Sequence, residues 1–165
     1  MLAHYEHELC SAAEQADCEH ITRIAQAMYI LKTDEYENIW WRVENRVNEL
    51  VEEGQMQPFH LVNIVRAFSR AQNNHMVGQE KTFVHLEPFI QKVLPELSAR
   101  DLTHVMYAYG VRGAGNPKFH EALLKQATAK VEELDYPGLH NLVYYLMFRD
   151  NKDESLWRTI IKQTT

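Results

Sequence analysis

Apolar residues recur along this chain at the spacing of one helix face, and the same short pattern is found four times. Each copy has an apolar residue at a leading position and further ones three, six and seven residues later. The four sets are Ile21, Ile24, Ala27 and Met28, then Leu61, Ile64, Ala67 and Phe68, then Leu102, Val105, Ala108 and Tyr109, then Leu139, Leu142, Tyr145 and Leu146. Each pattern predicts an amphipathic helix.

The leading positions lie 40, 41 and 37 residues apart. A period of about 37–41 residues is typical of helical-hairpin repeats and of no catalytic motif. A single hairpin cannot bury its own apolar stripe, so the copies are expected to stack. The sequence therefore predicts an all-α fold, a right-handed stack of about four helical hairpins (an α-solenoid).

Helix start signals stand four residues before each leading position. They are Asp17, Gln57, Ser98 and Asp135, and a proline follows the second at once and the fourth two residues later. Asp and Ser are favoured N-caps, and proline is tolerated in the first helical turn. Each start predicts the first helix of a repeat, and apolar residues with helical spacing predict a second helix after it. Because Pro88 falls inside one of these second helices, a kink or a helix start is expected near it.

A length of 165 residues suits one domain. We expect a single helical-repeat domain over residues 1–165. Residues 1–16 would form a capping helix, and residues 17–56, 57–97, 98–134 and 135–165 would form the repeats. Alternation of apolar and polar residues between tight turns, which would indicate strands, is almost absent.

The net charge of −6 is unevenly distributed. Residues 1–55 contain four Lys or Arg and twelve Asp or Glu, whereas residues 56–130 contain nine and five. This asymmetry favours a partner with its own charge pattern over a uniform polyanion such as duplex nucleic acid. The alternative is that these charges simply belong to solvated helix faces.

Targeting and membrane signals are not visible in the sequence. No stretch approaches the roughly 18 apolar residues of a membrane span, and the first residues resemble neither a secretion signal nor an Arg-rich transit peptide. The two cysteines, Cys10 and Cys18, are expected to be free thiols in a reducing compartment.

Residues that carry chemistry occur without a recognisable catalytic spacing. His4, His7, Cys10, Cys18 and His20 form the richest group of possible ligands, but their spacing matches no familiar structural zinc site. The glycine-rich segment 110–115 lacks the Lys-Ser/Thr of a nucleotide-binding loop and predicts a hairpin turn. We therefore expect no enzyme, metal, cofactor or small-molecule substrate.

The third repeat carries a family resemblance. Residues 97–110 begin with Leu97, Ser98, Asp101 and Leu102 and close with Tyr107, Ala108 and Tyr109. This segment resembles the octotricopeptide-like helical repeats of FAST-kinase-domain and RAP-domain organellar proteins. The match is good for residues 97–124, weaker for 17–51 and 57–94, and partial for 137–162. The resemblance implies a mitochondrial or plastid setting and hairpins that bind RNA or pack into organellar assemblies.

The favoured hypothesis is a non-enzymatic adaptor or accessory subunit. It would belong to a large mitochondrial assembly, such as the mitochondrial ribosome or an inner-membrane respiratory or ATP synthase complex, and would act through protein–protein contacts. A cytoplasmic location is the alternative. Adjacent aromatic residues cannot both face one core, so one member of each pair should point outward, and aromatics with Arg are enriched at binding hot spots. The candidate contact residues are Trp40, Trp41, Tyr144, Tyr145, Arg66, Arg70 and Arg112.

The alternative hypothesis is a single-stranded RNA-binding repeat protein in organellar RNA metabolism. Side chains on successive first helices would contact successive nucleotides. The candidate readers lie two residues after each leading position and are Arg23, Asn63, His104 and Asn141. The net negative charge argues against this alternative, because RNA readers gain much of their affinity from phosphate neutralisation.

Overall fold

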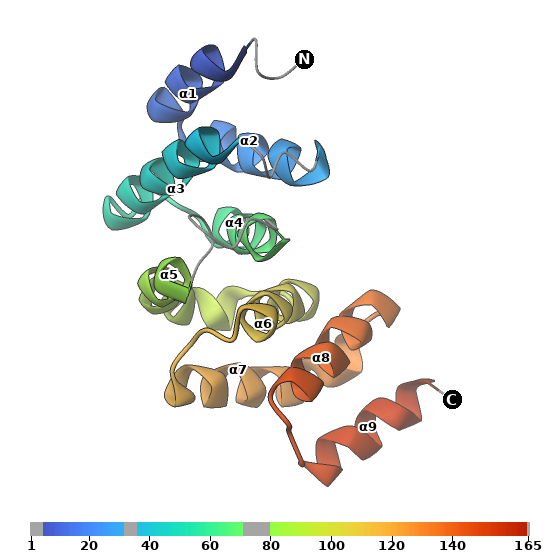
Figure 1. Cartoon of the computed structure of the whole chain (residues 1–165). Coiled ribbons are helices and arrows are strands. Elements are labelled where there is room, and N and C mark those ends of the chain that lie inside the picture. Colours follow the sequence, from blue (N-terminus) through green and yellow to red (C-terminus); the bar gives the residue numbers. More distant parts are fainter. Residues whose placement is uncertain (1–4, 32–35, 71–79, 165) are drawn as a thin grey trace.

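The chain is helical throughout the part that the computed structural model describes, which comprises residues 5–31, 36–70 and 80–164 (Figure 1). No strand occurs among these residues. The α-helices are α1 (Glu6–Gln15), α2 (Cys18–Leu31), α3 (Glu37–Glu52), α4 (Pro58–Arg70), α5 (Glu80–Val93), α6 (Ala99–Arg112), α7 (Pro117–Lys130), α8 (Tyr136–Phe148) and α9 (Glu154–Thr164). Two short 3₁₀ helices, η2 (Leu94–Glu96) and η3 (Val131–Glu133), follow α5 and α7. The prediction of an all-α fold is confirmed.

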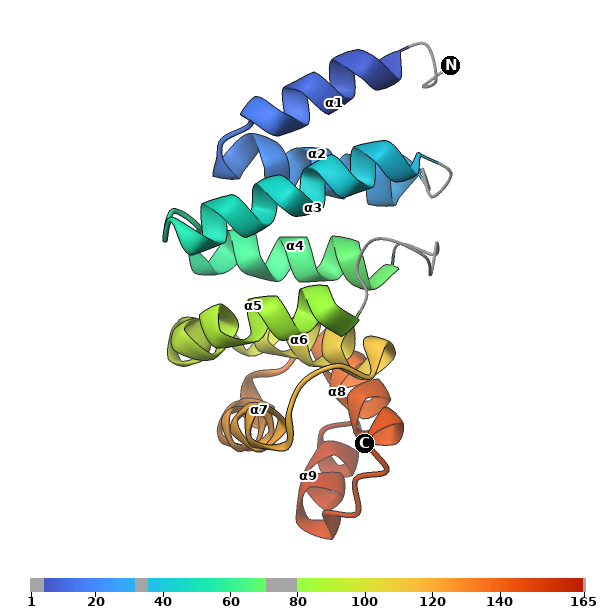
Figure 2. The ribbon, with the colours of Figure 1, turned by 60° about the vertical axis from the view of Figure 1, so that its left-hand side comes forward.

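The helices contact one another in two rows. In the even row, α2 packs on α4, α4 on α6, and α6 on α8. In the odd row, α1 packs on α3, α3 on α5, and α5 on α7. Figures 1 and 2 show α1 at one end of the molecule and α9 at the other, where α9 lies against η3. The four predicted first helices are thus the four members of the even row.

The predicted helix starts have the expected cap geometry where the sequence supplies a good cap. Ser98 accepts a hydrogen bond from the backbone N–H of Asp101, and Asp135 accepts one from Gly138. Asp17 accepts one from His20 in the same way before α2. These bonds satisfy amide groups that have no partner within the first helical turn.

Each helix of the even row has the same four sides, because successive residues turn about 100° around the axis. The leading position and the one seven residues later are buried in all four helices. Positions are counted here as the number of residues after the leading position. Positions 3 and 6 face the preceding helix of the row, as Tyr145 at position 6 of α8 shows by lying against Gly110 of α6. In α2, α4 and α6, positions 1, 4 and 8 face the following helix, as Gly110 of α6 shows by lying against Tyr145 of α8. Positions 2, 5 and 9 form the remaining side, which points away from the core.

The first copy of the pattern differs from the others in burial. Ile24 is only half-buried and Ala27 is exposed, whereas the equivalent residues of α4, α6 and α8 are buried. The first copy is therefore less buried than the other three at these two positions, although Ile24 still packs against the core. The physical reason is that no even-row helix precedes α2 among the described residues, so its positions 3 and 6 are not covered from that side. Ala25, at position 4, is buried against the next helix instead.

Pro88 neither starts nor ends a helix. It lies inside α5, which continues from Glu80 to Val93. Of the two alternatives expected near Pro88, the helix start is therefore wrong, and the kink stays a prediction. The residues before it, Phe83 and Leu86, are fully buried, so tertiary packing holds the helix together across the position where proline removes one backbone hydrogen bond.

An aromatic cluster joins the two rows where residues of α5, α6, α7 and α8 meet. The rings of Phe83 and Phe119 lie 5.0 and 4.7 Å from the ring of Tyr109, and the Tyr109 hydroxyl donates a 2.9 Å hydrogen bond to the carbonyl of Phe83. His120 lies beside them, with Nδ1 2.7 Å from the Tyr145 hydroxyl and Nε2 2.9 Å from the carbonyl of Ala114. Every polar atom named here has a partner, as burial requires.

Candidate functional site

The outward side of the even row forms a continuous surface across four helices, here called the even-row face. It consists of positions 2, 5 and 9 after each leading residue. Its members are Arg23, Gln26 and Ile30 on α2, Asn63, Arg66 and Arg70 on α4, His104, Tyr107 and Val111 on α6, and Asn141, Tyr144 and Phe148 on α8. Two residues at its border, Tyr29 of α2 and Arg100 of α6, are counted with the face because they act on Arg70 and Arg66. All except Asn141 are at least partly exposed. The face therefore presents a repeating array of side chains from consecutive helices.

Aromatic rings and one guanidinium run across this face in contact with one another. Arg70 lies over the rings of Tyr29 and Tyr107, at 5.2 and 5.7 Å from their centroids, and donates a hydrogen bond to the Tyr29 hydroxyl. The Tyr107 ring lies 6.0 Å from that of Tyr144, which in turn lies 6.1 Å from Phe148. Stacked aromatics and Arg are the residue types that dominate binding hot spots.

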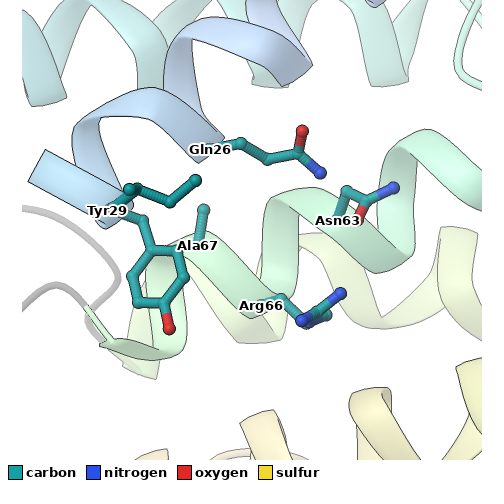
Figure 3. Close-up of a pocket in the computed structure, with 6 residues that line it drawn as sticks. Gln26, Tyr29, Asn63, Arg66 and Ala67 are labelled. Atoms are coloured by element: carbon teal, nitrogen blue, oxygen red, sulfur yellow. The ribbon is translucent and has the colours of Figure 1, made fainter.

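A pocket of about 210 Å³ opens between α2 and α4 on the same face (Figure 3). Gln26, Tyr29 and Ile30 of α2 line one side. Asn63, Arg66 and Ala67 of α4 line the other, as Figure 3 shows for the labelled side chains. Its wall is thus apolar on one part and carries a guanidinium and two amides on another, a combination that suits one side chain of a partner.

Positive charge gathers in the centre of the even-row face. Burial, followed by the charge of Arg70, lowers the pKa of Arg66, and Arg100 of α6 acts in the same direction. No ion pair of Arg66, Arg70 or Arg100 occurs among residues 5–31, 36–70 and 80–164. The nearby Asp101 carboxylate accepts a hydrogen bond from the Ser98 hydroxyl at 2.7 Å. The cluster therefore carries a net positive charge that the described part of the chain leaves largely unneutralised.

His104 lies within this cluster as a neutral ring. Burial, followed by the charges of Arg66 and Arg100, lowers the pKa of His104 from 6.5 to about 4. The Asn141 amide nitrogen lies 3.0 Å from Nδ1 of His104, and because an amide nitrogen can only donate, Nδ1 accepts. The hydrogen bond and the lowered pKa agree on the same protonation state.

This lowered pKa predicts a loss of stability in mild acid. Between pH 6.5 and about 4 the unfolded chain binds a proton at His104 that the folded chain does not, so the free energy of unfolding falls as the pH falls through this window. The variant His104→Gln keeps an acceptor for Asn141. Between pH 7 and pH 5, we expect its free energy of unfolding to fall by less than that of the wild type. Urea unfolding at the two pH values measures it, and equal losses in both proteins would contradict the assignment.

The two predicted aromatic pairs divide as expected between core and surface. Trp41 and Tyr144 are 43% and 42% exposed, whereas Trp40 and Tyr145 are 2% and 0% exposed. Trp40 and Tyr145 therefore belong to the core and are not contact residues, which corrects their place among the candidates. Trp41 lies on α3 in the odd row, with Arg42 over its ring at 4.8 Å, so it does not share a surface with Tyr144.

The three predicted arginines also divide. Arg66 and Arg70 lie on the even-row face, one lining the pocket and the other between two tyrosine rings. Arg112 is half-buried, burial lowers its pKa, and it donates a 2.7 Å hydrogen bond to the carbonyl of Phe68 at the end of α4. Arg112 thus binds the C-terminal end of a neighbouring helix, and its role as a contact residue stays a prediction.

The predicted RNA readers do lie in one column of the even-row face, but their polar groups are engaged within the chain. Arg23 pairs with Glu19 at 2.7 Å, and the Asn63 amide donates to the carbonyl of Phe59 at 2.9 Å. Asn141 is buried and bound to His104. Base readout needs free donors and acceptors, and this column offers few.

Several residues of the face were missed in the sequence, namely Gln26, Tyr29, Arg100, Tyr107 and Phe148. A signal was present for some of them, because residues three and seven places after position 2 lie on the same side of a helix. Extending that column would have added Gln26, Arg66, Tyr107 and Tyr144 together. The contribution of Arg100 depends on how α6 lies beside α4, which spacing within one helix does not contain.

Other chemistry is sparse in the described part of the chain. No group of three or more His, Cys, Asp or Glu there is placed to hold a metal ion, and His4 of the N-terminal group lies outside the described residues. Cys10 and Cys18 are free thiols. Segment 110–115 forms the end of α6 and the turn to α7, with Gly113 as the left-handed C-cap. Among the described residues, no helix is both long and apolar enough for a membrane span.

No protein-family model matches the chain, and no curated protein sequence matches it.

Proposed function

We propose that this chain is a non-enzymatic binding module, a right-handed stack of about four helical hairpins that serves as an accessory subunit of a large mitochondrial assembly. The observation that carries the proposal is the even-row face, where Tyr29, Arg70, Tyr107 and Tyr144 contact one another across four successive helices. A stack of helices presents such an array without any catalytic machinery. The resemblance of residues 97–124 to octotricopeptide-like repeats supports the organellar setting.

A protein partner accounts for the composition of this face. Ile30 is 71% exposed and Phe148 is 52% exposed, and Val111 adds a third apolar side chain in the same column. Contact with a polypeptide would remove this apolar surface from water, which stabilises a complex by about 25 cal/mol per Å² before the costs of association. A phosphate backbone would gain nothing from these residues. The partner would be a protein subunit of the mitochondrial ribosome or of an inner-membrane respiratory or ATP synthase complex.

Single-stranded RNA is the second candidate ligand. The observation that favours it is the cluster of Arg66, Arg70 and Arg100 beside the partly exposed Tyr107 ring, since aromatic stacking and guanidinium groups are how single strands are held. Against it stand the engaged polar groups of the reader column and the net charge of −6.

Site-specific photo-crosslinking tests the proposal. A photoreactive phenylalanine analogue placed at Tyr144 of the tagged full chain, in the cells that make it, is expected to form a protein adduct that survives nuclease treatment. The same substitution at Tyr136, which is 78% exposed at the start of α8, is the matched control. The adduct should migrate with a large particle on a density gradient. Adducts that nuclease removes would favour RNA, and equal adducts at both positions would contradict a specific face.

A further inference from the structure

The pocket between α2 and α4 and the arginine cluster lie side by side, because Arg66 belongs to both. We propose that the even-row face binds an acidic polypeptide segment in extended form, with one carboxylate among Arg66, Arg70 and Arg100 and one apolar side chain in the adjacent pocket. This inference rests on the proposed function and names the chemistry of the partner.

Charge complementarity is the first argument. The guanidinium groups of Arg66, Arg70 and Arg100 lie close enough to act on one another or on His104. Among the described residues, the carboxylate that acts on both Arg66 and His104 is that of Asp101. Holding like charges together raises the free energy of the unbound face, and a partner carboxylate would remove this cost. Arg also offers two parallel N–H groups to a carboxylate, which fixes the orientation of the bound segment.

The apolar lining beside the charges is the second argument. Tyr29, Ile30 and Ala67 give the pocket an apolar wall next to the Arg66 guanidinium. A ligand that fills both places must carry an apolar group and an anion a few ångströms apart. Side chains two residues apart in an extended acidic peptide have that arrangement. A ribose-phosphate chain instead offers charge at every unit and no aliphatic group for Ile30.

The width of the face sets the length of the segment. Packed helices lie about 8–10 Å apart, so the four helices of the even row span about 25–30 Å. An extended chain advances about 3.3 Å per residue, which corresponds to eight or nine residues. Alternate side chains of such a segment point to the same side, so carboxylate and apolar groups two residues apart can reach the cluster and the pocket together.

Fluorescence anisotropy with defined probes tests the inference on the full chain at about 150 mM salt. The probes are a panel of labelled nonapeptides with two Glu and two Leu at alternate positions in varied order on a Ser background, the same panel with Gln for Glu, and a labelled nine-nucleotide oligouridine. At least one acidic peptide is expected to bind saturably and at least tenfold more tightly than its Gln counterpart, because bonds to charged groups are stronger than neutral ones.

Matched variants locate the binding. The double variant Arg66→Gln, Arg100→Gln should bind the acidic peptide at least tenfold more weakly than the wild type does. Lys118→Gln with Lys125→Gln, which removes two exposed charges from α7 in the odd row, should change the affinity by less than twofold. Circular dichroism of both variants checks that the helices are intact.

The outcomes separate this inference from the proposed function. Equal affinity for acidic and neutral peptides, binding to no peptide, or equal losses in the two double variants would overturn the acidic segment, while protein adducts at Tyr144 would still support a protein-binding face. Tighter binding of oligouridine than of any peptide, lost in the arginine variant, would overturn both and assign the face to RNA.

Discussion

Replacing Phe119 by alanine is expected to lower the free energy of unfolding by about 3–5 kcal/mol, the range for removing a fully buried phenylalanine ring. Phe119 has no exposed surface and lies 4.7 Å from the Tyr109 ring and 6.1 Å from the His120 ring. It thereby links α7 of the odd row to α6 of the even row, and its neighbour His120 reaches Tyr145 of α8. The cavity left by alanine would lie where both rows meet, and the surrounding helices cannot close on it without breaking the hydrogen bonds of Tyr109 and His120.

Chemical denaturation followed by circular dichroism measures this loss. Phe119→Leu should give an intermediate value, because leucine fills part of the cavity. Tyr136→Ala is the matched control, since that ring is 78% exposed and its removal should change the free energy of unfolding by about 0.5 kcal/mol or less. A loss below about 1 kcal/mol for Phe119→Ala would contradict the packing described for this cluster.

The second large effect is expected at Gly115, in the turn between α6 and α7. Its φ of +101° lies in the region that side chains disfavour, and a Cβ there would meet His120 Nε2 at 2.9 Å and Phe119 Cδ1 at 3.1 Å. Neither neighbour can move freely, because His120 is bound on both ring nitrogens and Phe119 is buried. Gly115→Ala should therefore lower the free energy of unfolding by about 2–3 kcal/mol.

Gly113→Ala separates backbone strain from the steric contact. Gly113 also has a positive φ, +63°, but a Cβ there would meet nothing within 4 Å. Its replacement should cost about 1 kcal/mol from strain alone. Urea unfolding of both variants gives the difference. Equal losses would show that His120 and Phe119 yield to the added methyl group, contrary to the expectation.

Much of the helical fold could be predicted from the sequence because burial in a helix leaves a periodic trace. The leading residues Leu61, Leu102 and Leu139 are buried, and the start signals at Ser98 and Asp135 are N-caps. These are local properties, set within one helical turn. Ile24 and Ala27 are less buried than their counterparts because burial at these positions depends on a preceding even-row helix, which α2 does not have among the described residues.

The candidate face was harder to predict for a related reason. Within each Trp or Tyr pair, periodicity shows that one ring is buried, and the structure shows which. The roles of Arg70 and Arg112 depend on contacts between helices about 40 residues apart in sequence, Arg70 with Tyr29 and Arg112 with Phe68. Arg70 and Arg112 are the last residues of α4 and α6. Arg70 nevertheless lies on the face, whereas Arg112 binds the end of a neighbouring helix.

Each helix of the even row contacts its neighbours in the row through the same two sides. The packing of one helix pair in this row therefore does not depend on helices farther along it. One more unit placed between α4 and α6 would join its own two sides to theirs and leave the outer sides of α2 and α8 as they are.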